Sequence, residues 1–392
     1  MKELFIKTKV QQDWHDVLEE HGGDFKKLAH EVDEFANFPK QQVEKLVELG
    51  YTSITLPKAF GGNGFGVYDL ILLQETLARF DSNLALSIGW HLGVVGDIFE
   101  KQQWQVAQLD QFAIAIKNGA LVNRAVSEAA TGSPTRGGRP QTVALREGNH
   151  WVLNGRKSFT TASPVLTHFL VSAWIEEKQR IGFFLVHKSA KGLSIDETWN
   201  VVAMRGTGSH DLVLEDVVVH EDQLVELPDK QAGTYNGWAL HIPATYLGIA
   251  QAARDEAVQF SVRHSPNSIE GTISDLPNIQ RQIGLLDLKL TQARHLLYSV
   301  ATQYDDPKSR ILLTNEVEVV KYTVTNFALE IVDQAMRIVG AKSLSRQNAL
   351  QRHYRDVRAG LHNPPMDDMT ISRLAQTAIE REKSKLVKIG GR

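Results

Sequence analysis

The segment from about residue 120 to about residue 219 constrains the fold of this 392-residue chain more than any other part. It consists of short runs of β-branched and aromatic residues, such as 181–186 and 212–219, bounded by turn residues, which is typical of strands. On both sides, apolar residues recur at helical spacing instead, as in residues 70–80 and 279–290. The pattern predicts helices, then a β module, then helices again.

This order indicates the α+β fold class with three domains. We expect an N-terminal helical domain over residues 1–118, a small β-barrel or sheet domain over 119–224, and a C-terminal four-helix bundle over 225–392. Residues 84–93 are apolar on all sides and should form a buried helix. The pair Asn154-Gly155 is typical of a hairpin turn within the β module.

Composition excludes several classes of protein. The chain has no cysteine, so disulfides, thiolate metal sites and a cysteine nucleophile are absent. The net charge of -3, without a basic stripe, gives no reason to expect nucleic acid as a partner. No apolar run approaches the ~18 residues of a membrane span, and the fourteen histidines show no metal-ligand spacing. We therefore expect a cytoplasmic protein with no membrane partner and no metal.

The first part of the β module suggests a ligand site. Residues 125–133 are mostly small and allow backbone amides to approach a ligand closely, while 141–145 and 151–161 read as paired strands. A ligand could lie where this module meets a helical layer. The alternative interpretation of 125–161 is an ordinary surface loop followed by a hairpin.

Four segments in order resemble the acyl-CoA dehydrogenase superfamily. They are LPKAFGGNG at 56–64, VSEAATGS at 126–133, WVLNGRK followed by FTT at 151–161, and MRGTGS at 204–209. The second is similar to the family's Thr-Glu-Pro-x-x-Gly-Ser flavin loop, with Ala129 in place of proline. The similarity covers nearly the whole chain.

The resemblance implies a flavin held between the middle and C-terminal domains. FAD is the family default, and FMN is also possible. By position, Val126 and Ser127 would hydrogen-bond the ring edge, Phe159 would pack beside the ring, and Thr161 would reach its N5 side. The remaining residues placed at the cofactor by the resemblance are Gly132, Ser133, Arg263 and Gly340.

The cofactor's tail site departs from the family pattern. Arg263 is kept, but His264-Ser265-Pro266-Asn267 replaces the Phe-Gly that usually follows it. Gly340-Ala341 stands where two glycines are usual, and Arg337 stands where a glutamine normally contacts the adenosine. These changes weaken the preference for FAD over FMN.

The catalytic glutamate of the family is missing from both of its usual positions. Counting from Arg355-Asp356 by the family spacing leads to Pro364, and the alternative position on an earlier helix is Trp238. Neither side chain can accept a proton. If the reaction is dehydrogenation, Asp367, Asp368 or His362 is the best substitute base.

The segment 355–364 is similar instead to the flavin-dependent monooxygenase branch of the superfamily. That branch carries a histidine before Asn-Pro or Asp-Pro, here His362, and a second histidine from the N-terminal domain, here His91. Imidazole suits proton transfer to bound oxygen because it titrates near neutrality. The simpler interpretations stay open: His91 as a core histidine, His362 as part of a helix end, and Asp367 with Asp368 as helix caps.

Three functions therefore remain open. The first is a dehydrogenase of an acyl-CoA or another small-molecule thioester that passes electrons to an electron-transfer flavoprotein. The second is a two-component monooxygenase supplied with reduced flavin by a flavin reductase. The third is a binding protein for flavin or acyl-CoA that has lost catalysis. Since family members complete the flavin site from a neighbouring subunit, the resemblance implies a homodimer or homotetramer.

Overall fold

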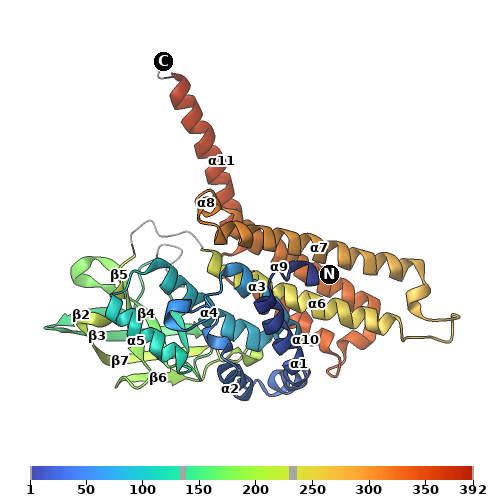
Figure 1. Ribbon diagram of the computed structural model, residues 1–392, viewed down its shortest axis with the longest axis horizontal. Helices are drawn as coiled ribbons and strands as arrows, with labels where there is room; N and C mark the ends of the chain where they lie inside the picture. Colours follow the sequence, from blue (N-terminus) through green and yellow to red (C-terminus); the bar gives the residue numbers. More distant parts are fainter. Residues whose placement is uncertain (1, 133–137, 229–235, 391–392) are drawn as a thin grey trace. The chain divides into compact units, whose positions relative to one another are not determined.

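The computed structural model describes residues 2–132, 138–228 and 236–390. They form two compact units: a sheet unit of Asp13–Leu70 and Asn83–Thr234, and a helical unit of Met1–Gln12, Ile71–Ser82 and Tyr235–Arg392. The predicted order of helices, strands and helices is confirmed, and with it the α+β fold class (Figure 1). The domain boundaries at 118/119 and 224/225 stay a prediction.

The sheet unit contains one eight-stranded sheet. Its strand order is β6-β7-β3-β2-β4-β5-β8, and β1 pairs with β4 beside this path. The strands are β1 (Val122–Ala125), β2 (Val143–Glu147), β3 (His150–Thr160), β4 (His168–Ile175), β5 (Arg180–His187), β6 (Leu193–Asp196), β7 (His210–His220) and β8 (Leu224–Glu226).

Strands β1 and β2 both run parallel to β4. β1 pairs with residues 168–171 of β4, and β2 pairs with Trp174 and Ile175 further along the same strand. The chain therefore leaves the sheet after Ala125 and rejoins it at Val143, and we refer to the described residues between them, 126–132 and 138–142, as the excursion. This topology explains why the segment rich in small residues lies next to the sheet.

The hairpin predicted at Asn154-Gly155 is wrong. These residues lie inside β3, and the turn joining β2 to β3 falls at Gly148, between Glu147 and His150. Gly155 has a φ of 154° and marks a register shift against β7. A Cβ at this position would lie 2.5 Å from Thr142 Oγ1, so the glycine is required by close backbone approach rather than by a turn.

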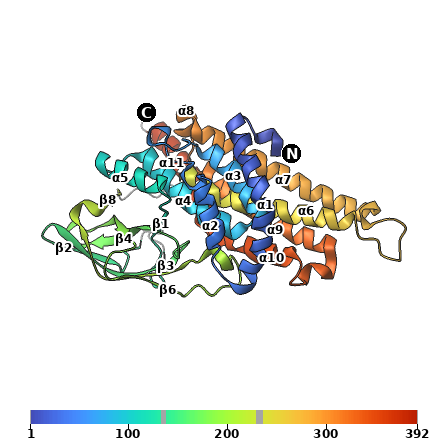
Figure 2. The same cartoon turned by 60° about the horizontal axis from the view of Figure 1, so that its bottom comes forward.

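Four helices lie largely in the sheet unit: α1 (Lys9–Phe35), α2 (Lys40–Glu48), α4 (Ser82–Lys101) and α5 (Val106–Lys117). The buried side chains of α4 and α5 pack with β1, β4 and β8 in one hydrophobic cluster that includes Val95, Phe112 and Leu170. Figure 2 shows these helices beside the strands of the unit. The predicted burial of residues 84–93 is confirmed for all but Trp90, which is partly exposed.

The helical unit is built on three long helices that pack against one another. They are α6 (His241–Ser261), α7 (Pro277–Asp305) and α9 (Glu316–Val339), with the shorter α10 (Ala349–Asp356) against α6 and α9. Part of α3 (Val67–Phe80) belongs to this unit, where Glu75 pairs with the buried Arg294 at 2.7 Å. The remaining helices are α8 (Pro307–Arg310) and α11 (Asp367–Gly390).

Within the described ranges, no helix has the length and apolar content needed to cross a bilayer.

Candidate functional site

A buried carboxylate anchors the excursion between β1 and β2. Glu128 accepts hydrogen bonds from Lys157 Nζ (2.7 Å), Thr142 Oγ1 (2.7 Å), Thr142 N (3.0 Å), Gln141 N (2.6 Å) and Thr131 Oγ1 (2.8 Å). The side chains of Lys157 and Glu128 are 0% and 3% exposed. One side chain thus fixes both ends of the excursion and joins them to β3.

The electrostatics of this anchor favour an ion pair. Burial would raise the pKa of Glu128, but the hydrogen bonds from Lys157, Thr142 and Gln141 outweigh it and lower the pKa to about 2. Burial lowers the pKa of Lys157, against the effect of the adjacent carboxylate. Lys157 also donates to Ser172 Oγ at 3.1 Å. Neither residue stands out in the sequence as a partner of the other, because only folding brings them together.

A backbone bridge between Glu128 and Gly132 closes one turn of the excursion. Glu128 N donates to Gly132 O at 3.0 Å, and Gly132 N donates to Glu128 O at 2.8 Å. Gly132 has a φ of 70°, in the left-handed region that favours glycine. Ser133, also predicted to contact the cofactor, lies outside the described residues.

The structure brings together four of the predicted ring-site residues. Ser158 N donates to Ser127 O at 2.8 Å, which places Val126 and Ser127 beside the end of β3, where Phe159 lies. The Asn123 side-chain amide donates to Thr161 O at 3.1 Å and links β1 to the same place. We refer to residues 126–127, 158–163 and 204–209 together as the platform.

Three of the seven described non-glycine residues with positive φ lie in the platform. Phe159, Ala162 and Met204 have φ values of 57°, 64° and 52°, unusual for residues other than glycine. Ala162 N donates to Thr207 O at 2.9 Å, so the two loops of the platform are in direct contact. Phe159 is nevertheless 63% exposed. Strained backbone beside an exposed aromatic ring is characteristic of ligand sites.

Three hydroxyl groups form a chain through the platform. Thr207 Oγ1 donates to Met204 O at 3.0 Å and lies 2.9 Å from Ser209 Oγ, which lies 2.9 Å from Thr161 Oγ1. Each hydroxyl has one proton. Since that of Thr207 goes to the carbonyl, Ser209 donates to Thr207 and Thr161 donates to Ser209. The oxygen of Thr161 is left as an acceptor.

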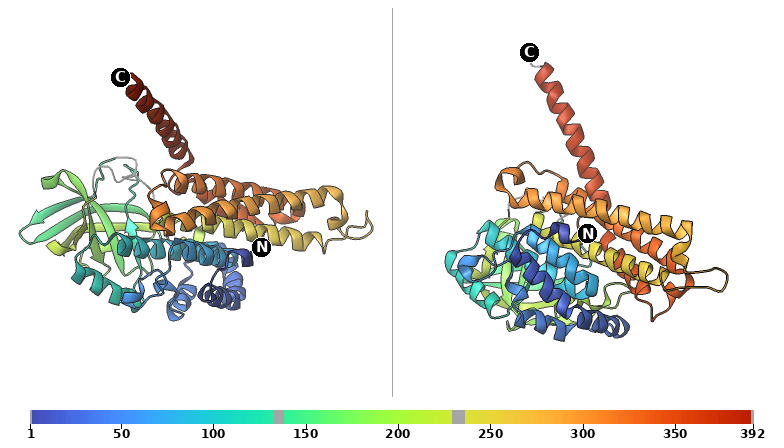
Figure 3. Two further views of the ribbon diagram at one scale, coloured as in Figure 1. Left: turned by 45° about the horizontal axis from the view of Figure 1, so that its top comes forward. Right: turned by 45° about the vertical axis from the view of Figure 1, so that its right-hand side comes forward.

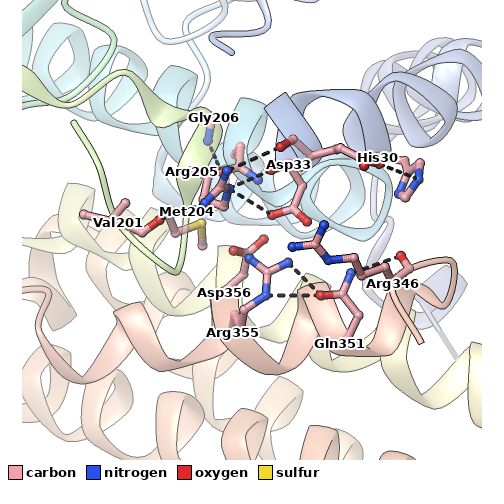
Figure 4. Close-up of polar contacts among 12 residues, drawn as sticks. His30, Asp33, Val201, Met204, Arg205, Gly206, Arg346, Gln351, Arg355 and Asp356 are labelled. Carbon is pink, nitrogen blue, oxygen red and sulfur yellow. Dashed lines mark hydrogen bonds and ion pairs between the residues drawn. The ribbon is translucent and has the colours of Figure 1, made fainter. Parts of the chain in front are cut away.

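The loop 204–209 is also fixed on its outer side. Arg205 Nε donates to Asp33 O at 2.7 Å, and Gly206 N donates to Asn83 Oδ1 at 3.0 Å. Figure 4 shows Arg205 reaching the α1 residue Asp33. A Cβ on Gly206 would lie 2.1 Å from Val32, so close packing requires this glycine.

His91 has the geometry of a core histidine. Its side chain is buried, Nδ1 accepts from Val122 N at 3.1 Å, and Nε2 lies 2.8 Å from Thr52 O, to which it donates. Burial lowers the pKa of His91 to about 4, so the ring is neutral at pH 7. Both ring nitrogens are used inside the sheet unit, which favours the simpler of the two interpretations of this residue.

The predicted tail-site residues lie at helix ends of the helical unit. Arg263 follows the end of α6 and is exposed. Gly340 ends α9 with a φ of 67°. It lines a shallow hollow of about 310 Å³ together with Asp333, Met336, Arg337, Ala341, Ser343, Leu344 and Tyr354. In the same unit, Arg355 donates to Gln351 at 2.8 Å (Figure 4).

The candidate acid–base residues differ in their surroundings. His362 is exposed at the end of the helical turn 357–361. Asp367 lies in the first turn of α11, where it accepts from Asn326 Nδ2 at 2.9 Å and lies 3.5 Å from Lys321 Nζ. Pro364 and the buried Trp238 occupy the two usual glutamate positions. Of His91, His362 and Asp367, only His362 has an exposed side chain.

Three family models match the chain in succession. The N-terminal, middle and C-terminal domain models of acyl-CoA dehydrogenase match residues 9–102, 123–217 and 234–361. The chain is 54% identical over 378 residues to YdbM of Bacillus subtilis (strain 168), whose name assigns it provisionally as an acyl-CoA dehydrogenase. That match covers 96% of this chain and 99% of YdbM.

Solved structures give the same result for the fold. Butyryl-CoA dehydrogenase from Megasphaera elsdenii matches with a TM-score of 0.86 at 21% identity, covering 95% of this chain and 99% of that one. A nitrososynthase from Micromonospora carbonacea var. africana matches with a TM-score of 0.82 at 25% identity, covering 95% and 97%. Two further structures with this fold are FMN complexes. The chain belongs to the acyl-CoA dehydrogenase family of flavin-dependent oxidoreductases.

Proposed function

We propose that this protein oxidises the Cα–Cβ bond of an acyl thioester, with FAD as its cofactor and an electron-transfer flavoprotein as its electron acceptor. The observation that carries the proposal is the strained platform around Phe159 and Thr161. Left-handed backbone at three non-glycine residues costs free energy, on the order of 1–3 kcal/mol each. Strain of this kind persists where the surrounding structure imposes it, and it is found more often at active sites and ligand-binding loops.

The residues of the platform fit a flavin ring. Phe159 offers an exposed aromatic surface, and Val126 and Ser127 offer backbone amides beside it. The side-chain oxygens of Ser158 and Thr160 are buried, and no hydrogen-bond partner for them is present among the described residues. Buried hydroxyls of this kind are usually satisfied by a ligand or by water.

The bound flavin would supply the hydride acceptor for the reaction. Thr161 would act through its oxygen, which the hydroxyl chain leaves as an acceptor for an N–H group of the ring. An acceptor at this position favours the reduced ring, which carries the additional N–H. Glu128 and Lys157 hold the loop that carries Val126 and Ser127.

We propose His362 as the group that takes the proton from the substrate. Its exposed imidazole is free of the contacts that engage Asp367 with Lys321 and Asn326. A neutral imidazole is a suitable general base near neutral pH. Asp367 then serves to anchor the start of α11.

Anaerobic mixing of the oxidised protein with a panel of acyl-CoAs tests the proposal. We expect at least one acyl-CoA to bleach the flavin absorbance. His362→Gln should slow bleaching at least 100-fold while flavin content stays unchanged, since general acid–base catalysis contributes about 10²–10⁴-fold. His30→Gln, an exposed histidine on α1, is the matched control and should behave like the parent protein. Absence of bleaching with every acyl-CoA would refute a dehydrogenase.

The second candidate is a monooxygenase supplied with reduced flavin by a separate reductase. It is favoured by the histidine before Asn363-Pro364 and by the similarity to a nitrososynthase. The measurement that distinguishes it is oxygen consumption that requires added reduced flavin and an oxidisable substrate. A protein that purifies without flavin, is not bleached by acyl-CoAs and consumes oxygen in this way would support the second candidate.

A further inference from the structure

The position of the His362 imidazole is set by the chain on either side of it. The ring is exposed and makes no hydrogen bond with the part of the chain that the structure describes. The backbone N–H of His362 donates to Ala359 O at 3.0 Å, which closes the helical turn 357–361. A general base must lie within hydrogen-bond reach of the proton that it removes. The contacts that hold residues 360–363 therefore also determine where the ring can act.

On the N-terminal side of the histidine, Gly360 packs against α6 and α9. These two helices lie side by side in the helical unit (Figures 1 and 3), and the turn 357–361 contacts both of them. A Cβ on Gly360 would lie 2.5 Å from Thr325 Cγ2 and 3.0 Å from Tyr246 Cδ2. Gly360 is buried, so the backbone of the turn packs directly on the Tyr246 ring and the Thr325 methyl group. Glycine is the residue that permits such a close approach.

On the C-terminal side of the histidine, the same tyrosine holds Asn363. The hydroxyl of Tyr246 donates to Asn363 Oδ1 across 117 positions of the chain. Asn363 precedes Pro364, and a residue before proline has a restricted backbone, so fixing its side chain also fixes the direction of the chain. Tyr246 is fully buried on α6. One side chain thus contacts the chain two residues before His362 through its ring and one residue after it through its hydroxyl.

The hydroxyl of Tyr246 stays protonated and remains a donor near neutral pH. Burial raises the pKa of Tyr246 above its usual value, and the charge of the Asp356 carboxylate raises this pKa further. Asp356 is itself fully buried and accepts a hydrogen bond from Ser82 Oγ at 3.0 Å. The hydrogen bond to Asn363 is therefore removed by substitution of the tyrosine and not by a change of pH.

The other polar attachments of this segment lie further from the histidine. Arg358 donates to Asp333 Oδ1 at 3.0 Å, but both side chains of this pair lie at the surface, where solvent weakens an ion pair. Asp367 is hydrogen-bonded to α9 at the start of α11. These two attachments are four and five residues from His362, whereas the contacts of Tyr246 are one and two residues from it. Tyr246 is therefore the best placed of these side chains to hold the histidine.

We infer that Tyr246 is a positioning residue for His362 and acts on it through Gly360 and Asn363. The inference rests on the proposed role of His362 as the base and names the side chain that holds this base in place. Placement matters because a shift of about 1 Å in a reacting group can cost ~10²-fold in rate. Loss of the hydroxyl alone releases Asn363 but leaves the ring packed under Gly360. Its effect should therefore be smaller than that of removing the imidazole itself.

The rate at which a saturating acyl-CoA bleaches the flavin tests the inference. Tyr246→Phe keeps the ring and should slow bleaching about 10-fold, and Asn363→Leu, which removes the acceptor, should reproduce this loss even if Tyr246→Phe does not fold. In His362→Gln, adding Tyr246→Phe should change the rate by less than about 2-fold, because residues that act as a unit are not additive. Tyr298→Phe removes another buried hydroxyl, which donates to Glu75 at 2.8 Å, and should leave the rate unchanged. Equal slowing in the presence and absence of His362 would overturn the inference.

A spin label at position 362 gives a second readout that does not depend on the reaction. The chain contains no cysteine, so His362→Cys provides a single thiol for a nitroxide label. Electron paramagnetic resonance should show faster motion of this label when Tyr246→Phe or Asn363→Leu is added, and no change when Tyr298→Phe is added. Unchanged motion with both of the first two substitutions would overturn the inference. If no acyl-CoA bleaches the flavin and the label nevertheless moves faster, the proposed function fails and the positioning role of Tyr246 is supported. Melting temperature and flavin content report whether each variant is folded.

Discussion

The anchor formed by Glu128 and Lys157 gives the sharpest test of how the sheet unit supports its site. Replacing Lys157 by methionine keeps the length and apolar volume of the side chain but removes the ammonium group. The carboxylate, 3% exposed, is then left with its contacts to Thr131, Gln141 and Thr142. Breaking a buried ion pair by removing one partner costs about 3–5 kcal/mol. Because four hydrogen bonds to Glu128 remain, we expect the lower end of this range, about 3 kcal/mol.

Urea denaturation followed by tryptophan fluorescence measures this cost in the flavin-free protein. A double-mutant cycle also requires Glu128→Gln and the variant with both substitutions, because the effects of substitutions within one hydrogen-bonded network are not additive. We expect the double variant to be more stable than the sum of the single losses predicts, by about 1–3 kcal/mol. Flavin affinity should fall in both single variants, since the loop carrying Val126 and Ser127 loses its anchor.

Arg156→Met is the matched control for this experiment. Arg156 directly precedes Lys157 in β3 and pairs with Asp196 and Asp211, but at the exposed surface. Its replacement should change stability much less than that of Lys157, because solvent screens an exposed ion pair. A loss below about 1 kcal/mol in Lys157→Met, or strict additivity in the cycle, would show that the buried pair does not hold the loop.

Three further predictions follow from the same unit. Acidification from pH 7 to pH 5 should destabilise the protein, because His91 stays neutral in the folded state, with a pKa of about 4, while the same histidine in the unfolded chain binds a proton below about pH 6.5. Urea titrations at the two pH values should show that His91→Gln loses about 2 kcal/mol less free energy of unfolding than the parent protein. An equal loss in both proteins would contradict a buried, neutral His91. Phe159→Gly should change the free energy of unfolding of the flavin-free protein by less than about 1 kcal/mol, because relief of left-handed strain offsets the added entropy of the unfolded chain. Flavin affinity, measured by fluorescence titration, should nevertheless fall. Unchanged affinity would remove Phe159 from the site. Gly155→Ala should lower the free energy of unfolding by about 2 kcal/mol in the same urea titration, because the new Cβ clashes with Thr142, which donates a hydrogen bond to Glu128. An unchanged free energy of unfolding would mean that Thr142 moves away from β3 without loss.

The sequence predicted well what depends on residues close together in the chain. The strands expected at 141–145, 151–161, 181–186 and 212–219 and the buried helix at 84–93 follow from local pattern, whereas the short strands β1, β6 and β8 were not predicted. The proximity of Val126 and Ser127 to Phe159 was expected from the family resemblance. The hairpin turn predicted at Asn154-Gly155 was wrong because the same dipeptide occurs in turns and in bulges, and only the close approach of Thr142 distinguishes the two. Local pattern does not report which strand lies opposite a glycine.

The candidate acid–base residues depended on contacts that a linear pattern does not contain. Lys321 and Asn326 on α9 engage Asp367 across 41 or more positions of the chain, and this separates it from the exposed His362. His91 similarly owes its neutral state to burial, and its ring nitrogens are engaged by Thr52 and Val122, which lie 39 and 31 positions away. In each case the residue type suggested chemistry, whereas the burial and the hydrogen-bond partners that favour a chemical or a structural role appear only in the fold.

The left-handed backbone of the platform must be held in place by the neighbouring strands, and this requirement explains why the anchor of Glu128 and Lys157 is ionic rather than apolar. A left-handed Phe159 and Ala162 relax to ordinary backbone unless the neighbouring strands hold them, so β3 needs a directional attachment near its end. An apolar contact at Lys157 would supply burial but no direction, whereas the ammonium group must meet both Glu128 and Ser172 at hydrogen-bond distance. The ion pair therefore fixes the position of Glu128 against β3 at some cost in stability. On this reasoning, Lys157→Met together with Glu128→Leu could regain stability without regaining flavin affinity, because the apolar pair restores packing but not the position of Ser127.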